Sequence, residues 1–401
     1  MIDIDLTDLD LFEKGMAEST FAKLRQETPI YWNSTTTGEG FWVLTRYNDI
    51  AWAWKQPKML SSEYGNMLRL RGHKDPAAGK MMVVTDPPYH TRLRMLLNHG
   101  FTPQAVVGLE PQIHTFVCEL LDQLVPGGEF DFVTEVAVKL PVSVTCKLLG
   151  VPISDWKLVA DLSTSSFAAE DSEFWKGSSV EQTLASSNLE ILFYFLDLIA
   201  KRRQQAQQDL VSSMIELRVN GSKLTDEEIA LNCFSFLLGG NETTRYAAAA
   251  GLLALIQRPE EASRLKEHPA LLPFAVEEIL RWATPNLHVL RVATQDMHIR
   301  DQLIREGEMV TLWSASANRD EEVFPDPYKF DVARTPNRHL TFGVGNHYCI
   351  GANIARLELQ NLFLEILRRD YSFDLVSEPS RLRSNFLSGF KHLPLRLRQA
   401  S

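Results

Sequence analysis

The chain contains few cysteines, and none of them stands in a C-x-x-C pair. Zinc sites and disulfide frameworks place cysteines in closely spaced pairs, so the wide spacing here argues against both kinds of site. Three of the four lie in apolar stretches with helical periodicity, where a cysteine is usually a small core residue. These three are Cys118, Cys146 and Cys233, and the fourth is Cys349.

Excess positive charge and a hydrophobic leader are also missing. The formal net charge of the chain is −10, whereas proteins that bind nucleic acids need clustered lysine and arginine to displace counterions from phosphates. The first residues, MIDIDL, are too acidic and polar for a signal peptide or a membrane anchor. We therefore expect a cytoplasmic protein without a nucleic-acid partner and without a membrane anchor.

No part of the sequence has the composition of a linker. Pro/Gly/Ser-rich spacers, low-complexity runs and internal repeats are absent, and 45% of the residues are hydrophobic. That share is enough for one large continuous core. The sequence therefore predicts a single domain over residues 1–401.

Helical patterns outnumber strand patterns. Residues 1–85 are expected to form a mixed α/β part, with the clearest strand at 41–44, and residues 86–401 a helix-rich core. Strand patterns rich in β-branched and aromatic residues return at 288–292 and 309–313. Because helices and strands do not alternate regularly, the sequence argues against a Rossmann fold or a barrel. It predicts a mainly α fold with a minor β region.

Cys349 has a different setting from the other cysteines. It follows the glycine-rich segment FGVGNHY, residues 342–348, and precedes apolar residues at helical spacing. At the start of a helix, unpaired backbone N–H groups and the helix dipole favour an anion. We therefore predict a lowered thiol pKa and a thiolate that can bind a metal.

Two other interpretations exist for such a segment. A glycine-rich loop before a helix is often a phosphate cradle. However, Tyr348 stands where G-x-G-x-x-G needs glycine, and the Gly-Lys-Ser/Thr ending of a P-loop is absent. A buried cysteine is otherwise usually a small apolar residue. The thiolate interpretation fits the segment better than either.

The longest predicted helix runs over residues 226–256, and its middle breaks the rules of helix composition. A capping box at Thr225 opens it. Gly239 and Gly240 in its interior cost about 1 kcal/mol each relative to alanine. The gap that they leave shares a face with the hydroxyl of Thr243, which predicts a groove with a hydroxyl beside it. The alternative is a helix whose glycines admit a neighbouring helix closely.

Two further helical segments carry paired polar side chains. Glu278 and Arg281 lie three residues apart on one helix face, a pairing that stabilises a helix by only about 0.2–0.5 kcal/mol. Asp86 is expected to cap the start of another helix, and His90 and Arg94 share one face of it. Such donors usually face solvent, but they would also suit the two carboxylates of one ligand.

Taken in order, these segments resemble the cytochrome P-450 haem-thiolate monooxygenases, in particular their soluble bacterial members. DPPYHTRLR is similar to the family's D-P-P-x-H-x-x-x-R, GGNET to A-G-x-E/D-T, EILR to E-x-x-R, and FGVGNHYCIG to F-x-x-G-x-x-x-C-x-G. Gly239 departs from the frequent alanine of the second motif. Matching segments extend from about residue 86 to residue 358. The resemblance implies the cytochrome P-450 fold, a single compact triangular domain.

The resemblance also implies roles for individual residues. Cys349 would be the proximal ligand of the iron in haem b. The other residues that would bind the haem are His90, Arg94, Arg291, Phe342, Gly343, His347 and Gly351. The residues that would serve oxygen activation are Gly240, Glu242 and Thr243, of which the acid and the alcohol deliver protons.

A structural ion pair is a further implication. Glu278 and Arg281 would support the loop that carries Cys349. In the family their third partner is usually an arginine in a P-x-R-F segment. This chain has Lys329 at that position, and lysine cannot form the bidentate fork of arginine.

The implied reaction is the insertion of one oxygen atom of dioxygen into a C–H or C=C bond of a lipophilic molecule. The chain has no flavin or iron–sulfur segment, so electrons from NAD(P)H would arrive through a separate ferredoxin and its reductase. We expect the ferredoxin to bind on the Cys349 face, where Arg94, Arg338 and Arg356 offer positive charge. We also expect a monomer.

The substrate pocket is expected to be mostly apolar. By position in the family, its residues would be Met67, Leu68, Phe167, Phe234, Leu238, Asn241, Leu287, Val289, Phe386 and Leu387. Apolar stripes of this kind belong to a core more often than to a pocket. As a pocket, the set indicates a terpenoid, steroid or polyketide. Residues 383–390 resemble members of the family that act on sterol or terpene skeletons.

Rival functions remain within the same fold and outside it. Desaturation and oxidative coupling cannot be separated from hydroxylation by sequence. Peroxygenase members lack the acid and threonine pair, so Glu242 and Thr243 argue against that activity. A haem-binding sensor without catalysis is the rival from another class, and it would not need a proton-delivery pair.

Overall fold

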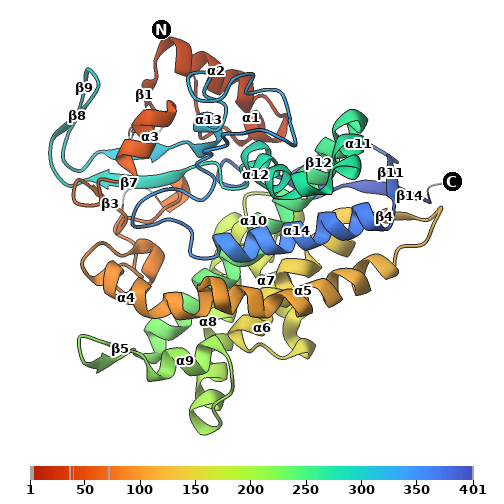
Figure 1. The fold of residues 1–401 in the computed structure, drawn as a ribbon. Coiled ribbons are helices and arrows are strands. Elements are labelled where there is room, and N and C mark those ends of the chain that lie inside the picture. The colour runs from red at the N-terminus through yellow and green to blue at the C-terminus, as the bar shows by residue number, and fades with distance from the viewer. Residues whose placement is uncertain (1–3, 36–37, 39, 71–72, 400–401) are drawn as a thin grey trace.

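The computed structural model describes residues 4–35, 38, 40–70 and 73–399. Helices make up most of the molecule (Figure 1). The largest sheet lies near the N-terminus, and the three-stranded sheet with β11 (Tyr371–Leu375) and β14 (Pro394–Gln399) lies near the C-terminus. The predicted mainly α fold with a minor β region is confirmed.

The largest sheet joins distant parts of the chain. Its strands, in spatial order, are β1 (Ile30–Asn33), β2 (Phe41–Leu44), β10 (Met309–Leu312), β7 (Val289–Ala293) and β3 (Leu60–Ser61). β2 lies antiparallel to β1 and parallel to β10. The three strands expected from the sequence are β2, β7 and β10. The N-terminal part and the segment before Cys349 therefore form one layer.

The other strands form short pairs and one three-stranded sheet. β11 (Tyr371–Leu375), β14 (Pro394–Gln399) and β4 (Glu129–Asp131) form the three-stranded sheet. The remaining strands are β5 (Arg218–Val219), β6 (Ser222–Lys223), β8 (Met297–Ile299), β9 (Gln302–Ile304), β12 (Ser380–Arg381) and β13 (Phe390–His392).

Many of the helices pack around α10 (Asp226–Ile256). The helices before it are α1 (Leu9–Glu13), α2 (Ala17–Glu27), α3 (Tyr47–Ala53), α4 (Tyr89–Leu97), α5 (Pro103–Asp122), α6 (Lys139–Leu149), α7 (Trp156–Phe167), α8 (Val180–Gln204) and α9 (Leu210–Glu216). Those after it are α11 (Pro259–Glu267), α12 (Leu272–Ala283), α13 (Ser314–Ala317) and α14 (Ala352–Arg368).

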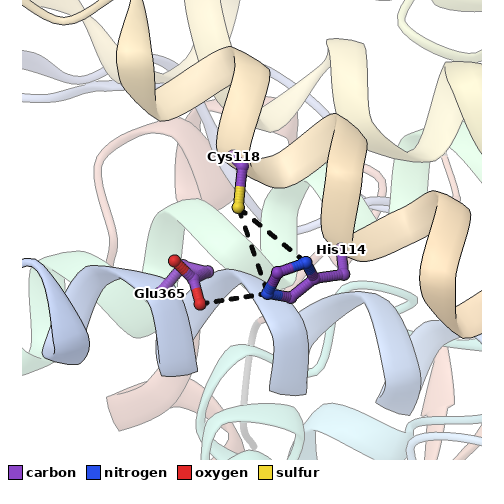
Figure 2. Close-up of side chains that lie close together, drawn as sticks. All are labelled: His114, Cys118 and Glu365. Atoms are coloured by element: carbon purple, nitrogen blue, oxygen red, sulfur yellow. Dashed lines mark hydrogen bonds and ion pairs between the residues drawn. The ribbon is translucent and has the colours of Figure 1, made fainter.

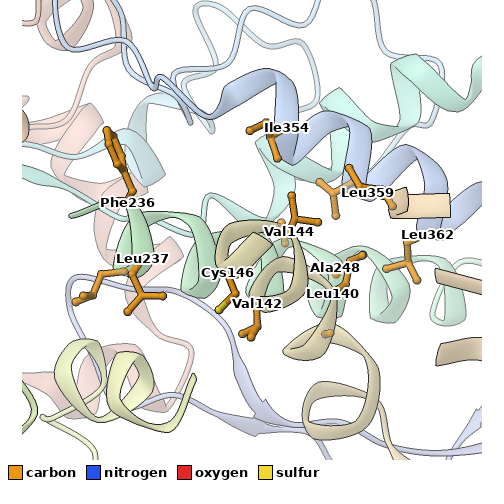
Figure 3. Close-up of a cluster of buried hydrophobic side chains, with 14 of the residues drawn as sticks. Leu140, Val142, Val144, Cys146, Phe236, Leu237, Ala248, Ile354, Leu359 and Leu362 are labelled. Carbon is orange, nitrogen blue, oxygen red and sulfur yellow. The ribbon is translucent and has the colours of Figure 1, made fainter. Parts of the chain in front are cut away.

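α10 is buried along most of its length, and the capping box predicted at Thr225 opens it. It packs against α6, α7, α8, α12 and α14, which suits a helix that is apolar on nearly all sides. Figure 3 shows part of this core, with Val144 from α6, Phe236 from α10 and Ile354 from α14. A Cβ atom on Gly251 would lie 2.7 Å from Cγ2 of Ile279, so α10 approaches α12 closely there.

The apolar cysteines divide into two kinds. Cys146 and Cys233 are fully buried, as expected. Cys118, expected in the core, is only partly buried. It lies on α5 at the surface between α5 and α14.

Asp86 does not cap a helix, which corrects the prediction. α4 begins at Tyr89, and the residue before it is Pro88. The carboxylate of Asp86 instead accepts hydrogen bonds from the backbone N–H of Ser62 at 2.9 Å and from the hydroxyl of Ser61 at 2.5 Å. It therefore ties the start of α4 to the segment after β3.

Within the described part of the chain, α8 is the one helix that is long and apolar enough to cross a membrane. A third of its apolar window is buried, and it packs against α7, α9 and α10. Core helices of soluble proteins have the same length and composition, so α8 is weak evidence for a membrane span.

Candidate active site

A cavity of about 290 Å³ lies between α10, the start of α14 and the segment before it. Cys349 reaches it from the α14 side, and Thr243 reaches it from α10. The residues predicted to bind haem all line it, namely His90, Arg94, Arg291, Phe342, Gly343, His347, Cys349 and Gly351. Segments from very different parts of the sequence thus meet at one site.

The loop before Cys349 depends on two glycines. Gly343 and Gly345 have φ values of 65° and 82°, in the left-handed region that favours glycine. A Cβ atom on Gly343 would lie 3.0 Å from Cζ2 of Trp54, and one on Gly345 would lie 3.0 Å from the carbonyl oxygen of Trp54. The N–H of Cys349 donates to the carbonyl of Phe342 at 2.8 Å, which closes the loop.

The thiol pKa of Cys349 differs from the prediction. The side chain keeps exposed surface on the cavity, yet desolvation by the surrounding protein raises its pKa above the ordinary value, while the Gly351 N–H and the charges of Arg94 and Arg356 act in the opposite direction. The expected helix effect is weaker than assumed, because α14 begins only at Ala352. The protein alone therefore favours the thiol, and a bound metal cation would favour the thiolate.

One edge of the cavity holds buried polar groups without a partner among the described residues. These are both ring nitrogens of His90 and Nε1 of Trp54. The His90 ring lies 4.0 Å from the His347 ring, and Arg94 and Arg291 line the same cavity. An unsatisfied buried polar group costs about 1–3 kcal/mol, so these groups call for a ligand. Two carboxylates would accept from the N–H donors among them, and the residues present therefore fit the propionates of a haem.

Burial sets the charges at this edge. It lowers the pKa of His90 to about 4, with a contribution from the charge of Arg94. It also lowers the pKa of His347 well below the ordinary value. Burial lowers the pKa of Arg291 to about 10, so this guanidinium stays charged at neutral pH. The edge thus presents neutral imidazoles beside cationic guanidinium groups.

The two glycines of α10 have different surroundings. A Cβ atom on Gly239 would meet no atom within 4 Å, whereas one on Gly240 would lie 2.6 Å from Oγ1 of Thr145 on α6. The hydroxyl of Thr243 donates to the carbonyl of Gly239 at 2.9 Å. Both interpretations of the glycine pair are therefore realised. Gly239 leaves a groove beside a hydroxyl, and Gly240 lets a neighbouring helix approach.

Glu242 is turned away from the cavity, unlike Thr243. Its Oε2 accepts hydrogen bonds from Arg245 and, at 3.3 Å, from the hydroxyl of Tyr246. Its Oε1 accepts one from the hydroxyl of Thr164 on α7 at 3.0 Å. The acid and the alcohol are neighbours in sequence, but the structure places their side chains in different environments.

The ion pair beneath the cysteine loop has a different third partner from the one expected. Glu278 and Arg281 are fully buried and paired at 2.7 Å. Nε of Arg334 lies 3.1 Å from both carboxylate oxygens of Glu278. Lys329 contributes only its backbone carbonyl, which accepts from Arg334 at 2.7 Å. Local sequence gave no signal for Arg334, because its role depends on a loop that folds back onto α12.

Four of the ten residues expected in the substrate pocket line the cavity, namely Phe167, Val289, Phe386 and Leu387. The other six do not, which corrects the predicted lining, and they are Met67, Leu68, Phe234, Leu238, Asn241 and Leu287. On α10 the error is one of helical phase, since Ser235 and Phe236 line the cavity in place of Phe234 and Leu238. Leu287 faces a second cavity, of about 330 Å³, beside α1 and α2.

Sequence reasoning missed several lining residues that carry polar groups. They are Trp54, Asn66, Thr145, Ser235, Asn286 and Glu358. Burial raises the pKa of Glu358 well above its ordinary value, and its Oε2 has no partner among the described residues. The sequence alone did not indicate that these residues line the cavity, because only packing brings them there.

The three arginines expected to attract a redox partner are not equivalent. Arg356 donates to both carboxylate oxygens of Glu277, at 2.6 and 2.9 Å. Arg94 is half-buried and lines the cavity. Arg338 is exposed, as is Tyr348 beside Cys349.

A cluster of possible metal ligands lies away from the cavity. Figure 2 shows His114 and Cys118 on α5 facing Glu365 on α14. Nε2 of His114 lies 3.2 Å from Oε1 of Glu365. Arg368 lies 3.0 Å from the same oxygen, and Arg369 lies 3.6 Å from Oε2. Because two guanidinium groups already neutralise the carboxylate, we interpret the cluster as an ion-pair network that joins α5 to α14.

Comparison with known proteins agrees with this geometry. The family described as Cytochrome P450 matches residues 179–270 and 268–395. The chain is 36% identical to the methyl-branched lipid omega-hydroxylase of Mycobacterium tuberculosis, over 98% of this chain and 94% of the relative. It is 33% identical to the linalool 8-monooxygenase of Pseudomonas putida, over 97% of both chains.

The similarity extends to solved structures. Mycobacterium marinum cytochrome P450 CYP268A2 in complex with pseudoionone superimposes with a TM-score of 0.91, at 30% identity over 98% of both chains. Similarity of sequence, fold and cavity over nearly the whole chain leaves one conclusion. The chain belongs to the cytochrome P450 family and is a monooxygenase that uses haem and dioxygen.

Proposed function

We propose that this monooxygenase inserts one oxygen atom of dioxygen into a C–H or C=C bond of a lipophilic small molecule of the terpenoid, steroid or polyketide type. The observation that carries the proposal is a largely apolar cavity with Cys349 on one side and the Gly239 groove with Thr243 on the other. The relatives named above act on a methyl-branched lipid and on linalool.

The chain's own residues would hold a haem b in this cavity. Cys349 would bind the iron, and His90, Arg94, Arg291 and His347 would bind the propionates, an assignment supported by the unpaired ring of His90 and by the position of all four on the cavity. Bound haem supplies oxygen activation, which donation from a thiolate ligand favours. Glu278 with Arg281 would keep the cysteine loop in place.

Thr243 would control protons on the opposite side. Its hydroxyl can donate and accept, and its present acceptor is the carbonyl of Gly239. We assign Oγ1 of Thr243 as the group that passes a proton into the cavity. Glu242 would resupply it through water after leaving Arg245, and Gly240 would keep the helix close to α6.

Electrons would come from NAD(P)H through a ferredoxin reductase and a ferredoxin. We place ferredoxin docking around exposed Arg338 and Tyr348, since these lie next to the Cys349 loop. Arg338→Glu is expected to slow reduction and to weaken its salt dependence. Arg218→Glu, at an exposed site on β5, serves as the matched control. Equal reduction rates in both variants would contradict the proposed docking site.

We further propose that residues 1–401 form one domain that works as a cytoplasmic monomer. The supporting observation is that the first strands and β10 share one sheet, so the N-terminal part and the helix-rich core have common hydrogen bonds. Limited proteolysis tests the domain assignment, and sedimentation of the haem-loaded protein tests the monomer. Separate stable fragments would contradict the single domain.

The central test is the absorption spectrum of the reduced, carbon-monoxide-bound protein. The red-shifted band typical of a thiolate ligand is expected in the wild type and in Cys118→Ser, but not in Cys349→Ser. Cys118 is a suitable control because it is partly buried and does not line the cavity. A wild-type spectrum without this band would overturn the proposed haem ligation.

A further inference from the structure

The segment between α12 and β7 forms a rigid part of the cavity wall. Pro285, Asn286 and Val289 line the cavity within this segment. The backbone carbonyl of Pro285 accepts from the N–H of Ser388 at 2.9 Å. The N–H of Leu287 donates to the carbonyl of Phe386 at 2.9 Å, and Asn286 itself forms a β-bridge with Leu387. The backbone of Asn286 is therefore held from both sides.

The side chain of Asn286, in contrast, makes no hydrogen bond to any residue in the described part of the chain. Both of its neighbours in sequence are buried, whereas Asn286 keeps part of its surface accessible. Since Asn286 lines the cavity, a side-chain amide with a free donor and a free acceptor stands on a well-held backbone at the cavity wall.

The surroundings of this amide are apolar. Phe386 and Leu387 flank it, and the Phe386 ring contacts the Phe167 ring with centroids 5.8 Å apart. A hydrocarbon that fills this space would expel water and leave the amide without a partner, which costs about 1–3 kcal/mol. A ketone or hydroxyl oxygen on the same skeleton would replace the lost water.

We propose that Asn286 is a specificity-determining residue that selects lipophilic substrates carrying a hydrogen-bonding oxygen. A ketone accepts from Nδ2 of Asn286, and a hydroxyl can also donate to its Oδ1. This inference rests on the proposed function and narrows its substrate class. Terpenoid and steroid ketones and alcohols fit it, whereas the parent hydrocarbons do not.

Two other polar residues, Ser235 and Asn66, line the cavity at positions different from that of Asn286. Ser235 lies on α10 and offers a single hydroxyl, whereas the amide of Asn286 offers a separate donor and acceptor. Asn66 lies at a different place on the wall. Its carbonyl accepts from the N–H of Leu290, which follows Val289, whereas Asn286 precedes Val289. Asn66 is therefore a matched control, with the same side chain on the same cavity at a second position.

The test uses the haem-loaded enzyme and pairs of ligands that share one skeleton. The pairs are pseudoionone and testosterone, each with the hydrocarbon in which hydrogens replace its oxygen atoms. The readout is the dissociation constant from the spectral change on ligand binding. In the wild type we expect the oxygenated member of a pair to bind about tenfold more tightly.

Three variants separate selection by Asn286 from general damage to the cavity. Asn286→Leu is expected to abolish the preference by weakening the oxygenated ligand about tenfold while leaving the hydrocarbon unchanged or tighter. Asn286→Asp, an acceptor when ionised, should favour testosterone over its 17-ketone, androstenedione. Asn66→Leu should keep the wild-type ratio. The thiolate band of each variant verifies that the haem site is intact.

The outcomes are distinguishable. Equal weakening of both members of a pair by Asn286→Leu would overturn the selection role, and so would loss of the ratio in Asn66→Leu. Failure of every ligand, oxygenated or not, to bind the wild type would overturn both this inference and the proposed lipophilic substrate class. A missing thiolate band would instead overturn the haem ligation.

Discussion

The cysteine loop and the middle of α10 face each other across one cavity, yet they satisfy their polar groups in opposite ways. On the loop side, His90 and Trp54 keep buried nitrogens without protein partners. On the α10 side, Glu242 is held by Arg245 and Thr164. The first region is organised for a ligand from outside the chain. In the second region the polar groups bond to one another, so Glu242 can transfer a proton only after its contacts with Arg245 and Thr164 have changed.

The difference also shows in what each region tolerates. The loop requires glycine at positions 343 and 345, because Trp54 lies against both. Of the adjacent glycines in the middle of α10, Gly240 is packed against a neighbour and Gly239 has free space. Backbone geometry therefore defines the loop, whereas side-chain networks define the function of α10.

The largest expected effect concerns the support beneath the loop. Arg334→Ala removes a cation that contacts both oxygens of fully buried Glu278. We expect a loss of about 3 kcal/mol in the free energy of unfolding, near the lower end for breaking a buried ion pair, because Arg281 remains. Chemical denaturation measures it. Lys329→Ala, at the exposed neighbouring site, should change stability by less than about 0.5 kcal/mol, and equal losses would contradict the assignment.

The next effect tests the division of labour within α10. Thr243→Ala removes the hydroxyl beside Gly239 and should lower the product formed per NAD(P)H consumed by roughly tenfold or more. Thr243→Ser keeps a hydroxyl and should preserve most of this coupling. Coupling is measured from NAD(P)H, product and peroxide in the same reaction. Full coupling in Thr243→Ala would show that another group supplies the proton.

A smaller effect distinguishes the two glycines. In Gly240→Ala the clash with Thr145 should lower the free energy of unfolding by about 1–3 kcal/mol. The higher helix propensity of alanine offsets about 1 kcal/mol of this, so we expect a net loss near 1 kcal/mol. Gly239→Ala meets no atom and should gain up to about 1 kcal/mol. Thermal unfolding of the haem-loaded variants compares them. Adding Thr145→Ala should rescue Gly240→Ala, and no rescue would argue against the clash.

The smallest effect lies outside both regions, where a histidine ties the connection between α7 and α8 to β13. His392 bonds to Asp131 at 2.5 Å and to Glu173 at 2.7 Å, and Lys391 also contacts Glu173. Burial lowers the pKa of His392, but the two carboxylates outweigh it and raise the pKa above its ordinary value.

This raised pKa gives the pH dependence its sign. The ion pairs of His392 stabilise the fold fully when the pH is below the pKa of His392 in the unfolded chain, about 6.5. This stabilisation disappears as the pH rises through the pKa of His392 in the folded protein. It should not exceed about 1 kcal/mol, since the side chain is 37% exposed and water screens the pair. The difference in unfolding free energy between the wild type and His392→Gln should shrink from pH 6 to pH 9. A difference that grows with pH would contradict the pairing.

Local patterns were sufficient for the predictions that came true. β2, β7 and β10 were visible as runs of β-branched and aromatic residues, and α10 was visible from its length and its capping box. The corrected lining of the cavity on α10 involved the direction of side chains. A shift of one residue on a helix turns a side chain by about 100°, so Ser235 and Phe236 replaced Phe234 and Leu238 at the cavity.

The sequence by itself determined the family, the fold class and the residues of the cysteine loop, because these rest on local backbone requirements and on residue types at fixed spacing. Only the tertiary structure decided that Arg334 supports Glu278, that Glu242 faces Arg245 and Thr164, and that Asn286 lines the cavity. The physical reason is that each of these contacts joins groups from separate elements. Their geometry exists only after the elements have packed.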